Sequence, residues 1–366
     1  MRIDLIAGAR PNFMKIASLV EALDDAALRG SRLTYRLIHT GQHYDRSMSG
    51  EFFAQLGLPE PQVNLEVGSG SHAEQTAGIM IGYERLLLRD RSDLCLVVGD
   101  ITSTMACAVT AQKHQLRVAH VEAGIRSGDW RMPEEINRLV TDAVTNWFFT
   151  TSETANENLR RSGVESSRIF FVGNTMIDTL LKQLPRLRPP ECWLPLKLES
   201  RNYLVVTLHR PGNVDHPENL LRILDAMSTA AKGLPVVFPM HPRTARVFQS
   251  ISQRAPRLHY VEPMGYLEFN YLVKNALAVV TDSGGVTEET TVLGVPCLTL
   301  RDTTERPETV TQGTNELLGT DPRALSPALD RVFAGDWKKG RVPDRWDGRA
   351  GRRIVEHLER LLVDPR

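Results

Sequence analysis

The sequence lacks the excess of basic residues that is typical of nucleic-acid-binding proteins and the long apolar segments that are typical of exported and membrane proteins. Its 366 residues include 44 Lys and Arg and 44 Asp and Glu, so no net charge attracts nucleic acid or an anionic membrane. No apolar run reaches the roughly eighteen residues that a membrane-spanning helix needs. Asp4, Arg10 and Pro11 interrupt the N-terminal apolar stretch, which is untypical of an export signal. We therefore expect a cytoplasmic protein without nucleic-acid or membrane partners.

Cysteines and cofactor-binding motifs are equally scarce. The four cysteines are Cys95, Cys107, Cys192 and Cys297. They form no C-x-x-C pair, and two of them lie in apolar runs, where a free thiol behaves as a small hydrophobic group. There is no P-loop and no H-E-x-x-H motif, and residues 8–15 carry Arg10 and Pro11 where a dinucleotide-binding loop has glycines. We expect no NAD, no metal ion and no other cofactor.

The apolar runs alternate with segments of helical spacing. They lie at residues 3–11, 35–43, 94–103, 118–124, 146–154 and 169–175, and again at 203–210, 234–242, 258–264, 277–285 and 295–302. Such alternation is typical of parallel sheets covered by helices. We predict an α/β protein with two Rossmann-like, doubly wound domains over residues 1–175 and 200–349, joined by a proline-rich linker at 176–199. A last helix within 350–366 has an apolar face that suits packing on either domain.

Carboxylates gather where the predicted strands of the first half end, which is where open parallel sheets bind ligands. Asp100 and Glu122 follow two successive apolar runs, and Glu134 lies in the first turn of the next predicted helix. Three carboxylates converging there would shift one another's pKa values, as acid/base catalysis requires. The alternative is that these acids cap helix starts, with Glu134 and Arg138 paired at i, i+4.

In the second half, Ser283, Gly284 and Gly285 lie between an apolar run and a predicted helix. The glycines would let a diphosphate approach the N–H groups of the helix start. Glu289, about one turn further on, would accept hydrogen bonds from ribose hydroxyls. The alternative is a tight turn followed by an acidic helix start.

Basic side chains follow other runs of the second half. Arg306, within residues 301–308, would place its guanidinium on a phosphate. His209 would stabilise or protonate a departing phosphate oxygen, and His241 repeats this pattern at the next strand end. The alternatives are a surface salt-bridge cluster for the arginine and a packing or capping role for the histidines. If the two domains face each other, all these groups converge on one interdomain cleft.

Together these motifs resemble a known family. The segments 8–11, 41–43, 99–100, 120–129, 133–138, 281–289 and 301–308 are similar, in order and spacing, to those of the non-hydrolysing UDP-N-acetylglucosamine 2-epimerases. The resemblance implies a GT-B-like fold whose C-terminal helix crosses back to the first domain, and a UDP-sugar substrate. It also implies inversion at C2 of the sugar without NAD or metal, by anti elimination of UDP to a 2-acetamidoglucal and re-addition. We also expect a homodimer.

The resemblance assigns roles to individual residues. The implied acid/base carboxylates are Asp100, Glu122 and Glu134, and His209 is implied beside the leaving diphosphate. The implied substrate contacts are Arg10, Lys15, Arg138, His241, Phe269, Ser283, Gly284, Gly285, Glu289 and Arg306. Gln42, His43 and Arg210 match the allosteric site of family members that their own substrate activates. We interpret Asp129, Arg131 and Glu135 as loop and helix-start charges, and we expect the segment 127–129 to be a mobile cover over the sugar.

Three positions depart from the family pattern. Asn12 replaces a glutamate, Thr287 replaces a glutamine, and Ser69 stands where the activating loop carries a glutamine, so we do not assume activation by substrate. The alternative activities are 2-epimerisation of a UDP-2,3-diacetamido uronic acid, hydrolysis to the free sugar, GT-B glycosyl transfer, and nucleotide-sugar binding without turnover. Glu122 argues against hydrolysis, because hydrolysing relatives tend to have a glycine-rich stretch there. Glycosyl transfer does not need three acids around the sugar C2.

Overall fold

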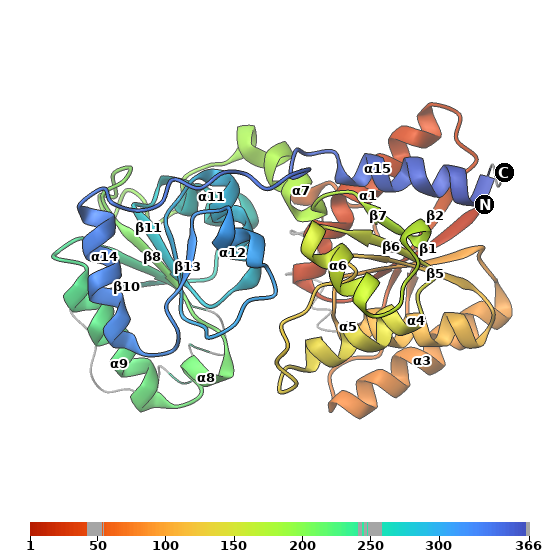
Figure 1. Cartoon of the computed structure of the whole chain (residues 1–366), viewed down its shortest axis with the longest axis horizontal. Helices are drawn as coiled ribbons and strands as arrows, with labels where there is room; N and C mark the ends of the chain where they lie inside the picture. Colours follow the sequence, from red (N-terminus) through yellow and green to blue (C-terminus); the bar gives the residue numbers. More distant parts are fainter. Residues whose placement is uncertain (42–52, 54, 241–243, 245–246, 248–257, 364–366) are drawn as a thin grey trace. The chain divides into compact units, whose positions relative to one another are not determined.

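The computed structural model of the chain divides into two compact units (Figure 1). The first unit comprises Met1–Lys182 and Asp344–Arg366, and the second comprises Gln183–Pro343. The structure describes residues 1–41, 53, 55–240, 244, 247 and 258–363, apart from the side chains at positions 10, 11 and 363. The segment expected to be a linker, 176–199, begins as a regular helix, α7 (Thr175–Gln183), and belongs to the first unit up to residue 182.

Within the described residues, the first unit is built on a parallel sheet of seven strands in the order β3-β2-β1-β4-β5-β6-β7. The strands are β1 (Arg2–Ala7), β2 (Thr34–His39), β3 (Val63–Asn64), β4 (Leu94–Val98), β5 (Arg117–Val121), β6 (Trp147–Thr150) and β7 (Ile169–Phe171). Besides α7, the helices that cover its two faces are α1 (Arg10–Leu28), α3 (His72–Arg89), α4 (Thr102–Lys113), α5 (Pro133–Ala143), α6 (Glu153–Arg161) and α15 (Ala350–Leu358). Strand β4 is wholly buried, which explains its unbroken apolar sequence.

The described part of the second unit holds a parallel sheet of six strands in the order β10-β9-β8-β11-β12-β13. The strands are β8 (Leu204–Thr207), β9 (Val236–Pro239), β10 (Leu258–Val261), β11 (Ala278–Thr281), β12 (Cys297–Thr299) and β13 (Asn315–Leu317). The helices are α8 (Pro211–Val214), α9 (Pro217–Ala230), α11 (Tyr266–Asn275), α12 (Gly284–Leu293), α13 (Pro307–Thr311) and α14 (Leu325–Phe333). The prediction of two doubly wound parallel sheets is confirmed.

In each sheet the order of strand addition reverses between two central neighbours. The reversal falls between β1 and β4 in the first unit and between β8 and β11 in the second. The loops that follow two such strands turn to opposite faces and leave a crevice at the carboxyl ends, where α/β proteins bind ligands. Asp100 follows β4, His209 follows β8, and Ser283 follows β11. The topology therefore places these predicted site residues at the reversal points.

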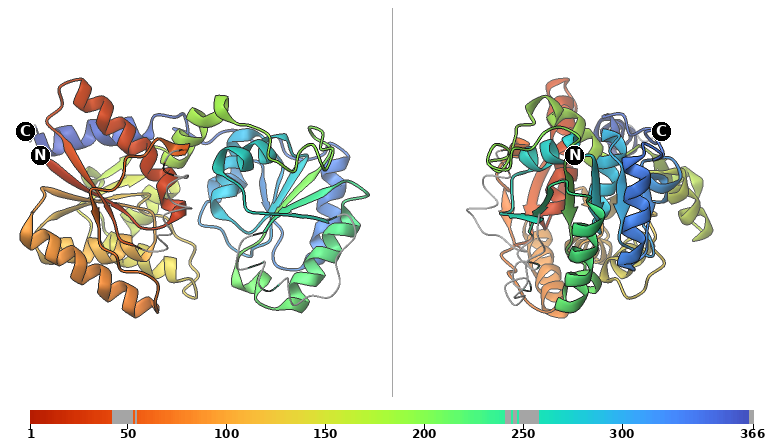
Figure 2. Two further views of the ribbon diagram at one scale, coloured as in Figure 1. Left: turned by 180° about the vertical axis from the view of Figure 1, so that it is seen from behind. Right: turned by 90° about the vertical axis from the view of Figure 1, so that its left-hand side faces the viewer.

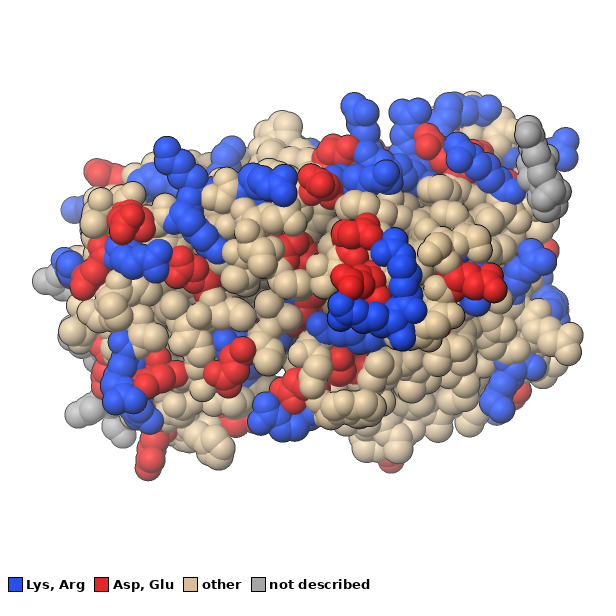
Figure 3. All heavy atoms as spheres, viewed as in Figure 1, with Lys and Arg blue, Asp and Glu red and all other residues tan. Residues whose placement is uncertain are grey.

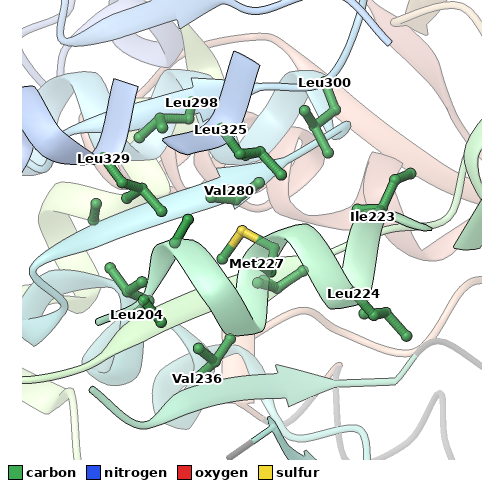
Figure 4. Close-up of a cluster of buried hydrophobic side chains, with 14 of the residues drawn as sticks. Leu204, Ile223, Leu224, Met227, Val236, Val280, Leu298, Leu300, Leu325 and Leu329 are labelled. Carbon is green, nitrogen blue, oxygen red and sulfur yellow. The ribbon is translucent and has the colours of Figure 1, made fainter. Parts of the chain in front are cut away.

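The core of the second unit shows how the amphipathic helices hold the sheet. Ile223, Leu224 and Met227 on α9 are at most 1% exposed and pack in one cluster with Val280 and Leu298 from neighbouring strands (Figure 4). Burial of one such side chain stabilises the fold by roughly 1.5–3 kcal/mol. This packing fixes β11 and β12, whose carboxyl ends carry the candidate site.

The C-terminal helix α15 belongs to the first unit and lies against α1 (Figure 2). The N–H of Gly351 at its start donates a 2.8 Å hydrogen bond to Asp178 on α7. A Cβ at Gly351 would lie 2.6 Å from the carbonyl oxygen of Ser18, so this close contact with α1 requires glycine. Trp346, just before the helix, is buried and donates to the carbonyl of Thr151 at 3.0 Å. The last part of the chain is thus an integral part of the first unit.

The surface has no dominant charge on the face viewed in Figure 3, where Lys and Arg are interspersed with Asp and Glu. In the parts of the chain that the structure describes, no helix is both long and apolar enough to cross a bilayer. All four cysteines are free thiols, and Cys95 and Cys297 are buried within their strands. The expectation that these two thiols serve as core residues is confirmed.

Candidate functional site

Asp100 is held at the end of β4 by a buried arginine. Nη1 of Arg138, on α5, lies 2.5 Å from Oδ2 of Asp100. The Arg138 side chain is only 2% exposed, whereas 30% of the Asp100 side chain is accessible. Asn137 on the same helix donates a 2.8 Å hydrogen bond to the Asp100 carbonyl. Helix α5 therefore orients Asp100, because a charge-assisted hydrogen bond to a buried guanidinium fixes the carboxylate direction.

Glu122 follows β5 in a strained conformation. Its φ of +72° lies in the left-handed region, which costs a non-glycine residue roughly 1–2 kcal/mol. The turn is anchored by a 2.9 Å hydrogen bond from the Glu122 N–H to the Phe149 carbonyl. The side chain is buried and forms an ion pair with Lys15 of α1. Since backbone strain of this kind clusters at functional sites, Glu122 is the strongest catalytic candidate of the first unit.

Glu134 differs from every other carboxylate near it. It is half-buried in the first turn of α5, and within the described residues its carboxylate has no hydrogen bond or ion pair. The alternative pairing of Glu134 with Arg138 does not occur, because Arg138 turns instead to Asp100 and to Glu135, 2.8 Å away. A half-buried carboxylate that the protein does not engage is suited to meet a substrate.

Glu135 has a structural role that the interpretation as a helix-start charge missed. Its carboxylate accepts hydrogen bonds from the N–H groups of Ser127 (2.9 Å) and Gly128 (3.0 Å) and from Nε of Arg138 (2.9 Å). Burial opposes ionisation, but these donors hold the pKa of Glu135 below its ordinary value. The expected mobile segment 127–129 is therefore tied to α5. The i, i+3 spacing of Glu135 and Arg138 is the one sequence signal of this contact.

A second buried network, also missed from the sequence, lies beneath the same strand ends. Nδ1 of His120 is 2.7 Å from Asp142, and Nε2 is 2.8 Å from the carbonyl of Gly99, directly before Asp100. Asp142 also accepts a hydrogen bond from the Gly124 N–H (3.1 Å) and pairs with Arg126 at 2.7 Å. Although burial opposes ionisation, these partners lower the pKa of Asp142. The network links the turn before Asp100 to the turn after Glu122.

Asn12, one of the departures from the family pattern, forms hydrogen bonds with the backbone at the ends of two strands of the first unit. Its Oδ1 accepts a hydrogen bond from the Gly8 N–H (3.3 Å), and its Nδ2 donates to the Val98 carbonyl (2.8 Å). A glutamate would lack the amide donor for Val98. Gly8 has no space for a side chain, since a Cβ there would lie 2.3 Å from Oγ of Ser103. Asn12 thus joins the ends of β1 and β4.

In the second unit, His209 is bound to a buried aspartate that the sequence reading did not single out. Asp282 follows β11, and its Oδ1 lies 2.8 Å from Nδ1 of His209. The carboxylate also accepts hydrogen bonds from the N–H groups of His209 (3.1 Å) and Arg210 (2.9 Å) and from Nδ2 of Asn213 (3.0 Å). The adjacency of β8 and β11 explains the contact, which no local sequence pattern encodes.

The residues predicted to bind an anion, Ser283 to Gly285, lie at the start of α12. Ser283 precedes the helix, and Gly284 and Gly285 open it, where N–H groups have no intrahelical acceptors. A Cβ at Gly284 would lie 2.7 Å from Oε1 of Glu305, so the glycine is needed for close approach. Glu305 pairs with Arg301 at 2.7 Å and with Arg210 at 3.7 Å. Arg210, predicted as an allosteric residue, therefore lies close to this helix start.

Glu289, predicted to bind ribose, is buried in the second turn of α12. It accepts a 3.3 Å hydrogen bond from Nδ2 of Asn270. Burial raises the pKa of Glu289 to about 7, although hydrogen bonds from Tyr266 and Asn270 act in the other direction. A buried carboxyl with such a pKa is a recognised mark of functional sites.

The remaining predicted residues of this unit have mixed surroundings. Arg306 is buried and forms an ion pair with Glu288 at 2.6 Å. The alternative of a surface salt bridge is therefore wrong, because the ion pair that forms is buried. Phe269 on α11 is half-buried and packs against the apolar core. Gln42, His43 and His241 lie outside the described residues, as does the side chain of Arg10.

Two doubly wound parallel-sheet units, each with polar groups at its strand-order reversal, define a protein of the GT-B-like class. The chain belongs to the UDP-N-acetylglucosamine 2-epimerase family, whose model matches residues 26–359.

Relatives are similar over nearly the whole chain. A UDP-N-acetylglucosamine 2-epimerase of Methanocaldococcus jannaschii is 39% identical, covering 98% of this chain and 99% of the relative. The crystal structure of the enzyme from that organism, in complex with UDP-GlcNAc and UDP, has a TM-score of 0.88 with 39% identity, and covers 98% of this chain and 99% of that one. A UDP-2,3-diacetamido-2,3-dideoxy-D-glucuronate 2-epimerase of Pseudomonas aeruginosa is 37% identical, covering 99% of this chain and 100% of the relative.

Proposed function

We propose that this protein interconverts UDP-GlcNAc and UDP-ManNAc. The observation that carries the proposal is the similarity to named UDP-GlcNAc 2-epimerases over 98% of the chain. The strained, buried Glu122 and the glycine-rich start of α12 add chemical support, because they supply the two kinds of group that the reaction needs. One is a set of carboxylates that moves a proton, and the other is an anion site that holds a diphosphate.

The proposed route is elimination followed by re-addition. The C2–H bond is not flanked by a carbonyl group, so simple deprotonation is unfavourable. A carboxylate takes the C2 proton while the C1–O bond breaks, its electron pair leaves with UDP, and a C1=C2 double bond forms in a 2-acetamidoglucal. UDP then adds back to C1 and a proton reaches the other face of C2. Proton and UDP are both returned, so the reaction consumes no oxidant.

In this proposal the first unit handles the sugar proton. Asp100, Glu122 and Glu134 exchange it, and Arg138 orients the first of these. The support is topological, since Asp100 and Glu122 follow the neighbouring strands β4 and β5 and Arg138 of α5 reaches Asp100 at 2.5 Å. Lys15 pairs with Glu122 and balances its buried charge.

The second unit is assigned to UDP. The N–H groups that open α12 bind the diphosphate, helped by the positive end of the helix dipole. His209 stabilises the departing phosphate oxygen, and Arg306 contributes a guanidinium. Glu289 accepts hydrogen bonds from the ribose, and Phe269 lies beside uracil.

A second candidate substrate is UDP-2,3-diacetamido uronic acid. It is favoured by one observation, the 37% identity to the P. aeruginosa epimerase that is named for it, which is close to the 39% identity to the M. jannaschii enzyme. Both substrates carry a 2-acetamido group and UDP, so the proposed residues serve either reaction.

Proton NMR in D₂O tests the activity. The protein is incubated with UDP-GlcNAc and, separately, with the diacetamido uronate, and the C2 proton signal is followed. The proposal expects deuterium at C2 and the 2-epimer of one of the two sugars. If neither exchange nor epimer forms with either sugar while UDP binds, the protein is a nucleotide-sugar binding protein without turnover.

Glu122→Gln tests the role of the strained glutamate. We expect loss of C2 exchange with UDP affinity, measured by calorimetry, retained. Glu157→Gln on α6, whose side chain is 55% exposed, is the matched control and should keep full activity. A comparable loss of UDP affinity in Glu122→Gln would make this residue a binding or structural residue.

The homodimer and the cytoplasmic location are parts of the same proposal. Four free cysteines suit a reducing compartment. Light scattering coupled to size-exclusion chromatography tests the dimer, which is refuted by a mass near the 41.0 kDa of one chain.

A further inference from the structure

Asp282 is a fully buried carboxylate next to a candidate catalytic histidine, and it has no part in the reaction steps proposed above. It is 0% exposed, yet its oxygens lie within hydrogen-bond distance of donors on His209, Arg210 and Asn213. A buried carboxylate is costly unless it is paired. A neutral Asn or Ser side chain can also accept hydrogen bonds from the N–H groups of a turn. The negative charge of Asp282 is therefore explained best by a partner that this charge stabilises.

That partner is the imidazole of His209. The Nδ1 to Oδ1 distance is 2.8 Å, and an ionised carboxylate only accepts hydrogen bonds, so Nδ1 carries the proton. The hydrogen bond from His209 is also the largest of the effects that lower the pKa of Asp282 against its burial. Nε2, on the opposite edge of the ring, points away from Asp282, and the His209 side chain is 39% exposed.

The backbone contacts explain why the ring orientation is well defined. Asp282 binds the N–H groups of His209 and Arg210, so the same carboxylate fixes both the turn that carries the imidazole and the ring itself. The buried amide of Asn213 donates to Asp282 and to the carbonyl of Leu300, and so holds the carboxylate from its other side.

We propose that Asp282 is a positioning residue that keeps His209 protonated at Nδ1 and directs Nε2 toward the leaving diphosphate of the substrate. The inference rests on the proposed function for the role of His209. As the C1–O bond breaks, negative charge builds up on the phosphate oxygen, and an Nε2–H of the imidazolium donates a hydrogen bond to it. Asp282 balances the positive charge of the ring in that state, as a buried carboxylate does for a catalytic histidine in other enzymes.

Nitrogen-15 NMR of the histidine side chains tests the orientation without turnover. The full-length protein is labelled with ¹⁵N-histidine, and the His209 signals are identified by their absence in His209→Asn. At a pH where the ring is neutral, the wild-type protein is expected to show Nδ1 protonated and Nε2 unprotonated. An Nε2-protonated neutral ring in the wild type overturns the proposal even if Asp282→Asn does not fold.

Asp282→Asn tests the charge. The amide keeps one acceptor for the turn but presents a donor to the ring, so we expect the neutral ring to switch to the Nε2-protonated tautomer. We expect kcat to fall by about 10²-fold or more, with KM changing less than threefold, because the imidazolium that donates to the departing phosphate oxygen loses the carboxylate that balances its charge, which acts on the chemical step. An unchanged tautomer, or an unchanged kcat together with a kcat of His209→Asn that is strongly reduced, overturns the proposal.

Asn213→Ala is the matched control, because it removes another hydrogen bond to Asp282 but leaves the contact with His209. It is expected to lower stability without changing the tautomer, and an equal tautomer switch in this variant shows that Asp282 acts only through the turn. The proposed role of His209 fails separately: if His209→Asn epimerises at the wild-type rate, His209 is not part of the reaction, whatever the tautomer. The proposed function itself fails if the wild-type protein forms neither a deuterated sugar nor an epimer.

Discussion

Glu134 and Glu135 are adjacent in sequence, and the structure predicts opposite consequences for replacing each with glutamine. Glu135 is 2% exposed, and its two oxygens serve the N–H groups of Ser127 and Gly128 and the guanidinium of Arg138. Glu134 is half-buried without such contacts. Glu135→Gln should therefore destabilise the first unit, and Glu134→Gln should leave its stability unchanged while affecting activity.

The magnitude follows from the hydrogen bonds of Glu135. Its Oε1 accepts from Gly128, and its Oε2 accepts from Ser127 and from Arg138. A glutamine supplies one acceptor oxygen, so its NH₂ group faces a buried donor, and the ion pair with Arg138 is reduced to a hydrogen bond between the guanidinium and a neutral amide. Arg138 keeps Asp100 as a partner, which limits the loss. We expect the free energy of unfolding to fall by about 2–4 kcal/mol.

Urea unfolding followed by circular dichroism measures this difference, and C2 proton exchange measures activity. Glu134→Gln should unfold within about 0.5 kcal/mol of the wild type. Its exchange rate should fall by about 10²-fold or more if it is a general acid or base. A stable Glu135→Gln together with a destabilised Glu134→Gln would refute the assignment of the two neighbours.

Two further predictions concern stability. Gly8→Ala should lower the free energy of unfolding by about 1–3 kcal/mol through overpacking, since its Cβ would lie 2.3 Å from Ser103 Oγ. Gly212→Ala is the control and should change the free energy of unfolding little, because a Cβ at Gly212 would have no neighbouring atom within 4 Å. Equal effects of the two substitutions in thermal denaturation would contradict this prediction. Burial raises the pKa of Glu289 from 4.5 to about 7, so folding favours the protonated carboxyl and stability is lost as the pH rises through that range. Glu289→Gln cannot ionise at this position and does not lose stability in this way. The free energy of unfolding of Glu289→Gln relative to that of the wild type should therefore rise by up to roughly 3 kcal/mol between about pH 5 and about pH 8. A difference between the two proteins that does not change with pH would refute the argument.

Much of the fold was readable because the relevant signals are local. Buried parallel strands require continuous apolar runs, so segments such as 94–98 and 278–281 can be predicted as strands from the sequence. Glycines and acids after these runs are equally local, and they pointed to Asp100, Glu122 and the start of α12. The boundary near residue 176 was harder to predict, because α7 owes its place in the first unit to tertiary packing.

The pairing of charges was not readable, because it depends on which strands become neighbours. Sequence spacing suggested that Glu134 pairs with Arg138, but the packing of α5 turns Arg138 toward Glu135 and Asp100, which is 38 residues away. His209 and Asp282 are 73 residues apart and meet only because β8 and β11 are adjacent.

The sequence by itself thus determined the class of fold, the family and the chemical types at the strand ends, because apolar periodicity and short motifs are properties of contiguous residues. The tertiary structure alone decided which carboxylates are held by arginine, lysine or histidine. The physical reason is that hydrogen bonds and ion pairs act over about 3 Å, and only the order of strands in the sheet brings distant residues that close.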